Sequence, residues 1–413
     1  MFTLWQDWKE FNQSVKDKRV VFFGVADDWF EKTFQYSNPN LAYIVDNSES
    51  RKGKKYMVTD KKSEFDVFDP EVLKKKDADI YIVITSGAYK SIIPQLVSYG
   101  LKPGADFCCT PALNNLKILG DIDACTTKLL ICSADHKIYT ELDKGKSGGG
   151  GLYLYDIALR QSTKVLEGTL HQIIDAGDKY YVLDEVRGGL VVSKNDYTVV
   201  KEFGFEMDAK SHGMAYSPER KLIFIAKSGL DKISVYSSET LDHVTDIMIS
   251  DKYTYYKKDM HHINDLFVTD RYLYVSLFSH SGNWSWGVYD GGIMEIDLDD
   301  YAVRRPLITN AWMPHSPKFI GSELFYLDSM RSILYRGNQR IVGEFSGFIR
   351  GLAHDGEYFY VGQSESRYFD KLKGIKNYIS LNGGFYLFDE VSKAGKFYSM
   401  PETRQIRNLI VLK

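Results

Sequence analysis

Hydrophobic residues in the first quarter of the chain fall into continuous runs separated by stretches with helical spacing. The runs at 19–24 (RVVFFG), 41–46 (LAYIVD), 80–87 (IYIVITSG) and 106–110 (DFCCT) predict strands. Helices are predicted at 70–79, at 88–100 and in the N-terminal segment that carries Trp5, Trp8, Phe11 and Val15. Continuous apolar strands that alternate with helices are typical of a parallel sheet covered on both faces, so we expect an α/β domain at residues 1–112.

From residue 119 onward the pattern changes to a repeat. Each copy is a polar residue, a short apolar run, a polar turn and a second apolar run, which predicts two antiparallel strands. Five copies are 171–184 (HQIIDAGDKYYVLD), 212–226 (HGMAYSPERKLIFIA), 262–276 (HINDLFVTDRYLYVS), 315–328 (HSPKFIGSELFYLD) and 350–362 (RGLAHDGEYFYVG). They recur every ~35–53 residues, and two further strand-like runs lie between copies, as at 232–249 and 292–308. Four strands in a repeat of this length predict the blades of a β-propeller.

A sixth blade can be assembled from the two ends of this region. The C-terminal run IRNLIVLK (406–413) matches the start of the copy at Arg350 and aligns Arg407 with it. The runs KLLICS (128–133) and LYLYDI (152–157) supply the strands that should follow. We therefore predict that residues 119–413 form an all-β six-bladed propeller closed by the C-terminal strand. A seven-bladed propeller would need a further copy of the repeat, and the sequence contains no such copy.

The lead residues of the six copies are expected to meet at one mouth of the central channel, because the innermost strand of each blade lines the axis. They are His171, His212, His262, His315, Arg350 and Arg407. Four imidazoles around one axis predict a metal site for a divalent ion such as Fe, Mn or Zn. Two guanidinium groups beside them could hold a carboxylate, phosphate or sulfate.

Three long loops should open on the same mouth. Loop 134–151 carries His136; loop 279–291 carries His280, Trp284, Trp286 and Tyr289; loop 364–383 carries Glu365, Arg367 and Tyr368. Long loops on a rigid scaffold are where binding residues concentrate. We expect Arg367 and the aromatic residues of 284–289 to bind substrate, as aromatic rings suit sugars.

We also expect catalytic roles for four side chains near this mouth. His136 or His280 would act as a base, and Arg350 and Arg407 would act on the substrate's acid group. Asp184 and Asp328, at the ends of second strands, are expected to orient the histidines.

Plain structural roles remain as alternatives at each of these positions. A repeated histidine can bond backbone groups of the neighbouring blade, and the arginines can fill the channel with charge-assisted hydrogen bonds. Trp284 and Trp286 can form a small core within their own loop. His261 beside His262 leaves the register of that copy uncertain.

Composition narrows the function classes. The formal net charge of −3 gives no broad attraction to nucleic acid. No apolar run approaches the ~18–20 residues of a membrane span. The four cysteines include two adjacent ones and form no C-x-x-C, which favours a reducing compartment. We expect a cytoplasmic protein with a small-molecule or sugar substrate and no nucleic-acid partner; a homo-oligomer is left open.

NAD(P) binding is not expected in the first domain, although Asp46 ends the second strand where a ribose-binding acid would sit. After Gly24 the chain carries Asp27, Asp28 and Trp29 in place of a glycine-rich turn. Two carboxylates would repel a pyrophosphate, and the indole would block close approach to the backbone.

Both halves of the chain resemble known groups of proteins. With VVFFG, IVDNSES, IVITSGAY and QLVSYGLKPGADF, the first quarter resembles a small Rossmann-like domain of the kind attached to bacterial sugar methyltransferases and other surface-polysaccharide proteins. With HHINDLFV, LFSHSGNW, MPHSPKF, FSGFIRGLA and VGQSESR, about 290 residues resemble a bacterial β-propeller family of uncharacterised activity. The first resemblance implies a setting in polysaccharide biosynthesis, and the second implies architecture only.

The function expected from these features is a metal-dependent enzyme acting on a small anionic or sugar-derived substrate. Analogy of architecture alone suggests lyase or oxygenase chemistry: carotenoid-cleaving oxygenases hold iron with four axial histidines, and some propeller uronate lyases combine a metal with an arginine and a base. The alternative is a non-catalytic propeller scaffold that binds a carbohydrate or a protein. A metal-free lyase or hydrolase that uses histidine and arginine alone is a third hypothesis, for which the sequence has no G-x-S-x-G, H-E-x-x-H or paired-carboxylate motif.

Overall fold

The chain divides into two compact units, at residues 1–124 and 125–413. The computed structural model describes residues 3–25, 27–59, 62–75, 77, 79–135, 149–372, 374–375 and 378–412. The boundary falls between Ala124 and Cys125, and not in the 113–118 interval left between the two predicted domains, because Asn114–Asp123 folds as helix α4. None of the described helices is long and apolar enough to cross a membrane.

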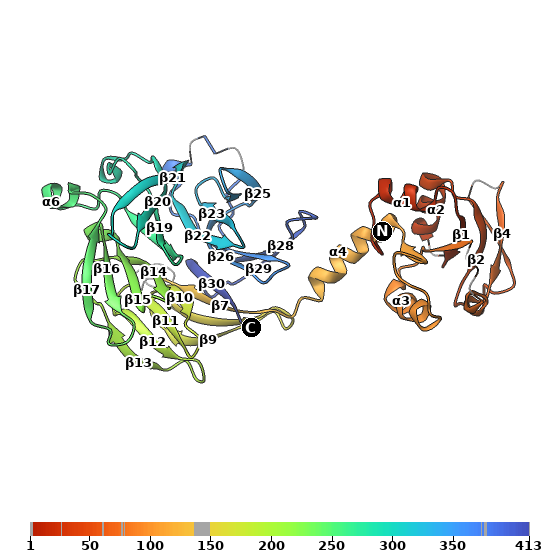
Figure 1. Cartoon of the computed structure of the whole chain (residues 1–413), viewed down its shortest axis with the longest axis horizontal. Coiled ribbons are helices and arrows are strands. Elements are labelled where there is room, and N and C mark those ends of the chain that lie inside the picture. The colour runs from red at the N-terminus through yellow and green to blue at the C-terminus, as the bar shows by residue number, and fades with distance from the viewer. Residues whose placement is uncertain are drawn as a thin grey trace. The chain divides into compact units, whose positions relative to one another are not determined.

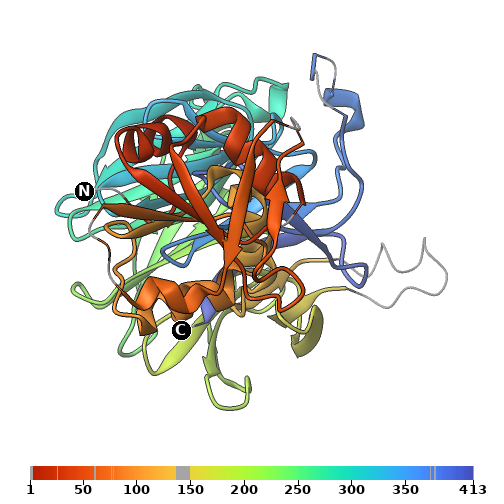
Figure 2. The same ribbon diagram turned by 90° about the vertical axis from the view of Figure 1, so that its right-hand side faces the viewer.

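The N-terminal unit is built on a six-stranded mixed sheet in the order β3-β4-β2-β1-β5-β6 (Figures 1 and 2). Strand β3 pairs antiparallel with β4, and the other neighbours are parallel. The strands are β1 Arg19–Phe23, β2 Leu41–Val45, β3 Lys55–Met57, β4 Glu64–Phe68, β5 Ile80–Ile84 and β6 Phe107–Cys109. The helices are α1 Trp8–Val15, α2 Asp27–Ser37, η1 Pro70–Lys74, α3 Tyr89–Ser98, η2 Pro111–Leu113 and α4.

Alternate residues of the central strand face two separate cores. Val20 and Phe22 pack with residues of α1 and α2, whereas Val21 and Phe23 pack with residues of α3. Apolar side chains on both faces explain why the strand reads as one continuous run. The predicted strands β1, β2, β5 and β6 are present; β3 and β4 were not predicted, and the predicted helix at 70–79 is only the short 3-10 helix η1.

Two side chains, Asp46 and Trp29, contact the turns at the carboxyl edge of this sheet. The Asp46 carboxylate accepts hydrogen bonds from the backbone N–H groups of Val25 (2.9 Å) and Ser48 (2.8 Å) and pairs with Arg51 at 3.0 Å. Trp29 lies against Gly87, where an added Cβ would meet the indole at 2.8 Å. Asp46 therefore ties the end of β2 to the turn after β1.

The C-terminal unit consists of six four-stranded antiparallel sheets among its described residues, each in sequential order except the one that contains both ends (Figure 1). Blade 1 is β30 Ile406–Leu412, β7 Lys128–Ser133, β8 Gly151–Asp156 and β9 Gln161–Glu167. Blade 2 is β10 Leu170–Asp175, β11 Lys179–Asp184, β12 Gly188–Ser193 and β13 Val199–Phe203. Blade 3 is β14 Ser211–Ser217, β15 Leu222–Lys227, β16 Lys232–Ser237 and β17 His243–Met248.

The remaining three blades follow the same plan. Blade 4 is β18 Ile263–Val268, β19 Tyr272–Leu277, β20 Gly291–Asp297 and β21 Val303–Ala311. Blade 5 is β22 Pro314–Ile320, β23 Glu323–Asp328, β24 Ile333–Arg336 and β25 Arg340–Glu344. Blade 6 is β26 Phe348–His354, β27 Phe359–Ser364, β28 Gly384–Phe388 and β29 Gly395–Ser399. Short helices occur at η3 Ser228–Leu230, α6 Lys252–Tyr256, η4 Trp284–Trp286 and η5 Phe369–Lys371.

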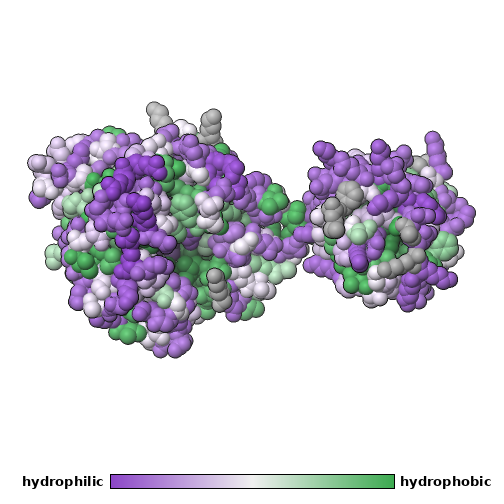
Figure 3. Space-filling view, viewed as in Figure 1, coloured by the Kyte–Doolittle hydropathy of each residue, from purple (hydrophilic) through white to green (hydrophobic). Residues whose placement is uncertain are grey.

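These sheets confirm the six-bladed propeller predicted from the repeat, including its closure. The C-terminal strand β30 pairs antiparallel with β7, so the two ends of the unit share blade 1. Apolar residues of neighbouring blades pack in shared clusters, and Figure 3 shows a largely hydrophilic face with apolar atoms gathered in a hollow. The inner strands come close together at the axis: a Cβ at Gly213 would lie 2.1 Å from the carbonyl oxygen of Asn264.

Candidate functional site

The inner strands carry a β-bulge near their first residues. In β10 the ladder shifts between Leu170 and Gln172, and in β30 it shifts between Ile406 and Asn408, so His171 and Arg407 are the inserted residues. The same shift in β14 makes His212 the inserted residue. A bulge re-aims the inserted side chain. In these three blades the bulge accounts for the polar residue that precedes the apolar run.

Four of the six predicted lead residues line one pocket at the axis. The pocket has a volume of about 180 Å³. Its lining residues are Glu185, His212, His262, Asn264, Arg350, Arg367, Tyr368 and Arg407. They come from blades 1, 2, 3, 4 and 6, so ring closure brings together residues that are as far as 222 positions apart in sequence, from Glu185 to Arg407.

The other two lead residues lie beside the pocket and do not line it. The ring of His171 stacks on that of His212 at a centroid distance of 4.9 Å, and its Nε2 is 3.0 Å from Glu185. The ring of His315 lies between Phe278 and Phe348, at 5.3 and 5.8 Å. The register differs in blades 4 and 5, because His262 precedes the first residue of β18 and His315 still pairs with Leu327 before the bulge.

Positive charge dominates the pocket. Arg350 is only 2% exposed, and its Nε and Nη1 have no hydrogen-bond partner; the same is true of Nε of Arg407. Burial, followed by repulsion from Arg407, lowers the pKa of Arg350 well below its ordinary value. Burial and repulsion from Arg367 lower the pKa of Arg407 to about 10. Buried cations with unsatisfied donors are suited to binding an anion.

The same arginine charges change the pKa of the Tyr368 phenol. Burial alone would raise the pKa of its phenol, but Arg350, Arg367 and Arg407 together outweigh burial and lower it. The ring of Tyr368 lies 5.3 Å from that of Phe348. A phenol whose anion is stabilised by neighbouring cations can exchange a proton more readily than an ordinary tyrosine.

Hydrogen bonds fix the tautomer of two of the histidines. Ser228 donates its O–H to the carbonyl of Ile263, so it must accept from Nδ1–H of His212 at 3.0 Å. Burial lowers the pKa of His212 well below 6.5 and keeps the ring neutral. Nε2 of His212 therefore carries a free lone pair.

His315 repeats this arrangement one blade further on from His262. Ser329 donates to the carbonyl of Ile349, so Nδ1–H of His315 donates to Ser329 (2.7 Å) and to the carbonyl of Met313 (2.9 Å). Its Nε2 is buried without a hydrogen-bond partner. In His262, Nδ1 bonds the carboxylate of Asp259.

The carboxylates expected to orient the histidines do something else. Asp184 accepts from the backbone N–H of Val186 and pairs with Arg187, and Asp328 accepts from the backbone N–H of Trp312 and pairs with Arg331. The histidines are held instead by the residue that follows each second strand. These partners are Glu185 for His171, Ser228 for His212 and Ser329 for His315. Successive side chains of a strand point in opposite directions, which separates Asp184 from Glu185.

The loop residues are divided between the pocket and its surroundings. Trp284 lies 4.8 Å from the ring of His262, and Tyr289 lies 5.1 Å from Trp284. Trp286 is 53% exposed and contacts Tyr256 edge-on at 5.0 Å. His280 is not among the pocket-lining residues: its Nε2 lies 2.9 Å from the carbonyl oxygen of Ile308. His136 lies outside the described residues.

Three residues of the pocket were missed by the sequence analysis or given no role there: Glu185, Asn264 and Tyr368. Glu185 could have been found from strand alternation after Asp184, whereas the bulge that places Asn264 is visible only in the structure. In the described part of the chain, no group of three or more histidine, cysteine, aspartate or glutamate side chains is arranged to hold a metal ion.

Acid should weaken the fold through the buried histidines. The pKa of His171 is lowered to about 4 by burial and Arg407, and that of His315 is lowered by burial and Arg350, so the unfolded chain binds these protons first as pH falls below about 6.5. The quantity to compare is the unfolding free energy that each protein loses when the pH is lowered from 6 to 5. We expect this loss to be smaller in His315→Gln than in the unaltered protein by roughly 1 kcal/mol.

Denaturant titrations at the two pH values measure this difference. Asp231 and Asp265, whose pKa values are raised by burial to about 7 and about 6, act in the opposite direction in both proteins and cancel in the comparison. An equal loss in the two proteins would contradict the assignment of a neutral buried His315.

Comparison with known proteins adds information on the fold. No protein-family model matches the chain, and no relative was found among curated proteins. Among solved structures, a chain of a nidogen/laminin complex is similar over 70% of this chain and 98% of its own length, with a TM-score of 0.50 and 12% identity. A protein of unknown function from Bacteroides caccae covers 70% of this chain and all of its own length, with a TM-score of 0.48 and 10% identity.

At such low identity the likeness shows architecture alone. The similarity to the nidogen/laminin structure and the six observed sheets agree on a six-bladed β-propeller. The pocket on its axis must therefore be interpreted from its own chemistry.

Proposed function

We propose that this propeller is an enzyme that binds a small acid in the axial pocket, with the carboxylate of a sugar-derived substrate held by Arg350 and Arg407. The observation that carries the proposal is the buried guanidinium of Arg350, whose Nε and Nη1 have no partner although the residue is 2% exposed. A carboxylate oxygen accepts strong, charge-assisted hydrogen bonds from such donors and neutralises the buried charge. Nearby aromatic rings, Trp284 and Tyr289, suit a sugar ring.

The side chains around the arginines suit β-elimination from an acidic sugar. Arginines that neutralise the carboxylate make the hydrogen on the adjacent carbon more acidic. Nε2 of His212 takes that proton, the electron pair forms a carbon–carbon double bond, and the bond to the β-oxygen breaks. The departing oxygen takes a proton from Tyr368, whose pKa is lowered by the neighbouring arginines despite its burial.

We expect the purified protein to convert a uronic-acid oligosaccharide to an unsaturated product, followed by the ultraviolet absorbance of the conjugated double bond. His212→Gln and Tyr368→Phe should each reduce kcat by about 10²–10⁴-fold, the usual worth of a positioned acid or base. His243→Gln, on the outer strand of blade 3, is the matched control and should retain full activity. Binding without turnover across such substrates would favour the non-catalytic carbohydrate-binding alternative.

A metal-dependent version of the same enzyme is a second candidate, favoured by the histidine orientations. His212 and His262 in the pocket, and His315 beside it, each use Nδ1 on a protein acceptor, as metal-binding histidines commonly do. Nε2 of each is left for a metal, although the described side chains do not already form a group of three around one point. His171 does not fit this pattern, because its Nε2 bonds Glu185. Elemental analysis for Fe, Mn and Zn tests this candidate, and activity that survives chelation would reject it.

The biological setting rests on the N-terminal unit. We also propose that this unit is Rossmann-like and that the protein acts in surface-polysaccharide biosynthesis in the cytoplasm. The parallel strands β4, β2, β1, β5 and β6, with helices packed on both faces, are what supports the first of these.

A further inference from the structure

A second cavity lies on the propeller axis, among later residues of the same six inner strands. Its volume is about 210 Å³. Residues from β10, β14, β18, β22, β26 and β30 line it, and its walls are mainly apolar, with Ile173, Met214, Leu266 and Leu352 among them. None of these residues lines the arginine pocket, so the cavity needs its own explanation.

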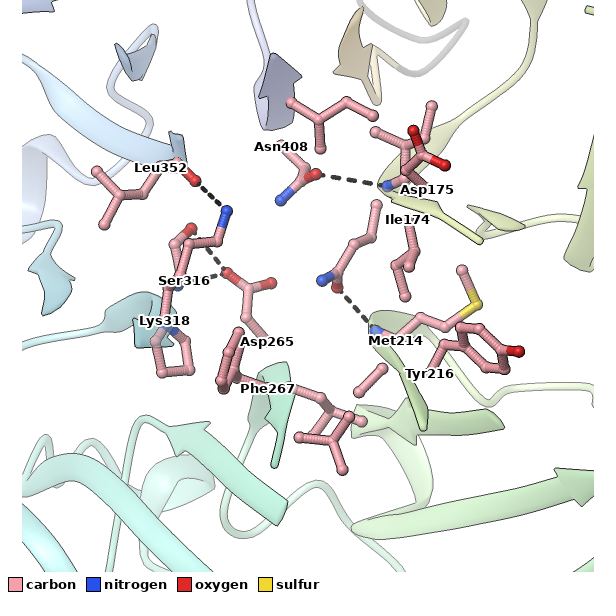
Figure 4. Close-up of a pocket in the computed structure, with 17 residues that line it drawn as sticks. Ile174, Asp175, Met214, Tyr216, Asp265, Phe267, Ser316, Lys318, Leu352 and Asn408 are labelled. Atoms are coloured by element: carbon pink, nitrogen blue, oxygen red, sulfur yellow. Dashed lines mark hydrogen bonds between the residues drawn. The ribbon is translucent and has the colours of Figure 1, made fainter. Parts of the chain in front are cut away.

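Lys318 is the cation of this cavity. Its Nζ donates one hydrogen bond, to the carbonyl oxygen of Leu352 on the next blade at 2.7 Å. A lysine ammonium group has three N–H donors, so one acceptor leaves it poorly satisfied. Figure 4 shows the amine between Leu352 and the amide nitrogen of Asn408, at the edge of the central space.

Asp265 faces the same space from the neighbouring blade. One carboxylate oxygen accepts from the backbone N–H of Ser316 at 2.7 Å and from its hydroxyl at 3.3 Å. The other oxygen points toward the centre of the cavity in Figure 4. Asp265 is 6% exposed, and burial raises its pKa to about 6, so it can hold or release a proton near neutrality.

Burial also changes the state of the amine. It lowers the pKa of Lys318 to about 8, against the opposing attraction of Asp265. The pKa of His354 is lowered mainly by burial and, to the smallest extent, by the charge of Lys318. A substantial fraction of Lys318 is therefore a neutral amine at mildly alkaline pH, and a neutral lysine in an apolar cavity is a nucleophile for carbonyl carbons.

We propose that Lys318 is a carbonyl-reactive amine that forms an imine with a small aldehyde or ketone bound in the axial cavity. Nζ attacks the carbonyl carbon, the π electrons move to the oxygen, and Asp265 passes the first proton lost by the nitrogen to that oxygen. The resulting carbinolamine loses water with a proton supplied by Asp265, so that amine and carbonyl compound give imine and water. Asp265 takes back the proton that leaves the nitrogen.

The dimensions of the cavity limit the substrate. Its volume equals the share of about seven water molecules in the liquid. Apolar walls with amide donors from Asn408 favour a compound of a few carbon atoms that carries one or two oxygen groups. This inference is independent of the proposed function, because it uses none of the residues of the arginine pocket.

Reductive trapping tests the proposal on the full chain. The protein is incubated at pH 8 with propanal or glyoxylate, reduced with borohydride, digested and analysed by mass spectrometry. We expect adduct at Lys318 at a yield at least tenfold higher than at Lys221, an exposed lysine of blade 3 that pairs with Glu239 at 2.6 Å. Yields at Lys318 equal to or below those at Lys221 would overturn the proposal.

Two further measurements separate reactivity from simple accessibility. Competitive acetylation across pH should show Lys318 gaining reactivity near pH 8, well before Lys221. Asp265→Asn should slow adduct formation at Lys318 by at least tenfold if Asp265 transfers the proton, although it should move the acetylation of Lys318 to lower pH, because the carboxylate no longer raises the lysine pKa. A cavity that holds only water would give no adduct at Lys318 in the folded protein, and this outcome would reject the inference.

Discussion

Replacing Arg350 with glutamine is expected to weaken the binding of a carboxylate ligand by about 30- to 5,000-fold. This range corresponds to about 2–5 kcal/mol, the usual cost of truncating one partner of a buried, hydrogen-bonded charge pair. Arg350 should carry most of the effect because it is the most deeply buried guanidinium of the pocket, at 2% exposure, and because two of its donors have no protein partner.

The same substitution should leave the fold as stable as before, or more stable. In the unliganded protein, burial and Arg407 both disfavour the charged form of Arg350. Removing such a cation relieves desolvation and repulsion, whereas a structural arginine that satisfied backbone groups would cost about 3–5 kcal/mol when lost. A variant that binds the ligand more weakly but is no less stable therefore identifies a ligand-binding arginine. An arginine that only fills the channel would instead be needed for stability.

Calorimetry with galacturonate and with inorganic phosphate measures the affinity, and thermal unfolding measures the stability. Arg340→Gln is the matched control, because Arg340 lies on the outer strand of blade 5 and pairs with Glu323. It should change neither quantity beyond about 0.5 kcal/mol. A large loss of stability in Arg350→Gln with unchanged ligand affinity would refute the assignment.

The propeller could be predicted from the sequence because each repeat obeys a local rule. A polar residue, two apolar runs and a polar turn define two strands, and their spacing defines a blade. The match between IRNLIVLK and the copy at Arg350 even identified the closing strand, which pairs with β7 as predicted. The N-terminal sheet was harder: β3 and β4 have largely exposed or half-exposed residues, so they lack the continuous apolar run that marked the other strands.

The pocket could be predicted only in part, because the positions of its side chains depend on bulges and on ring closure, which the residue types do not reveal. Bulges set the register of the inner strands, and the bulge falls one or two residues later in blades 4 and 5. His262 and His315 consequently take different positions from His171, although all three are histidines at the start of their repeat copies. Glu185 and Tyr368 enter the pocket from segments that follow second strands, and only ring closure brings these segments together.

Deleting residues 406–413 should abolish folding of the propeller unit. Strand β30 forms the inner edge of blade 1, pairs with β7 along its length and contacts β26 and β10 of the flanking blades. Without it, β7 becomes an exposed apolar edge, and the ring has no contact between blades 6 and 1 at the axis. We expect aggregation or loss of the cooperative unfolding transition of residues 125–413, followed by calorimetry and by limited proteolysis.

A single substitution in the same strand gives a measurable version of this effect. Leu409 is fully buried and lies opposite Ile131, so Leu409→Ala should lower the unfolding free energy by about 2–5 kcal/mol through lost burial and the cavity left behind. Ile341→Ala is the matched control, because Ile341 is 52% exposed on an outer strand, and it should cost much less. Similar small losses in both variants would show that closure by β30 does not hold the ring together.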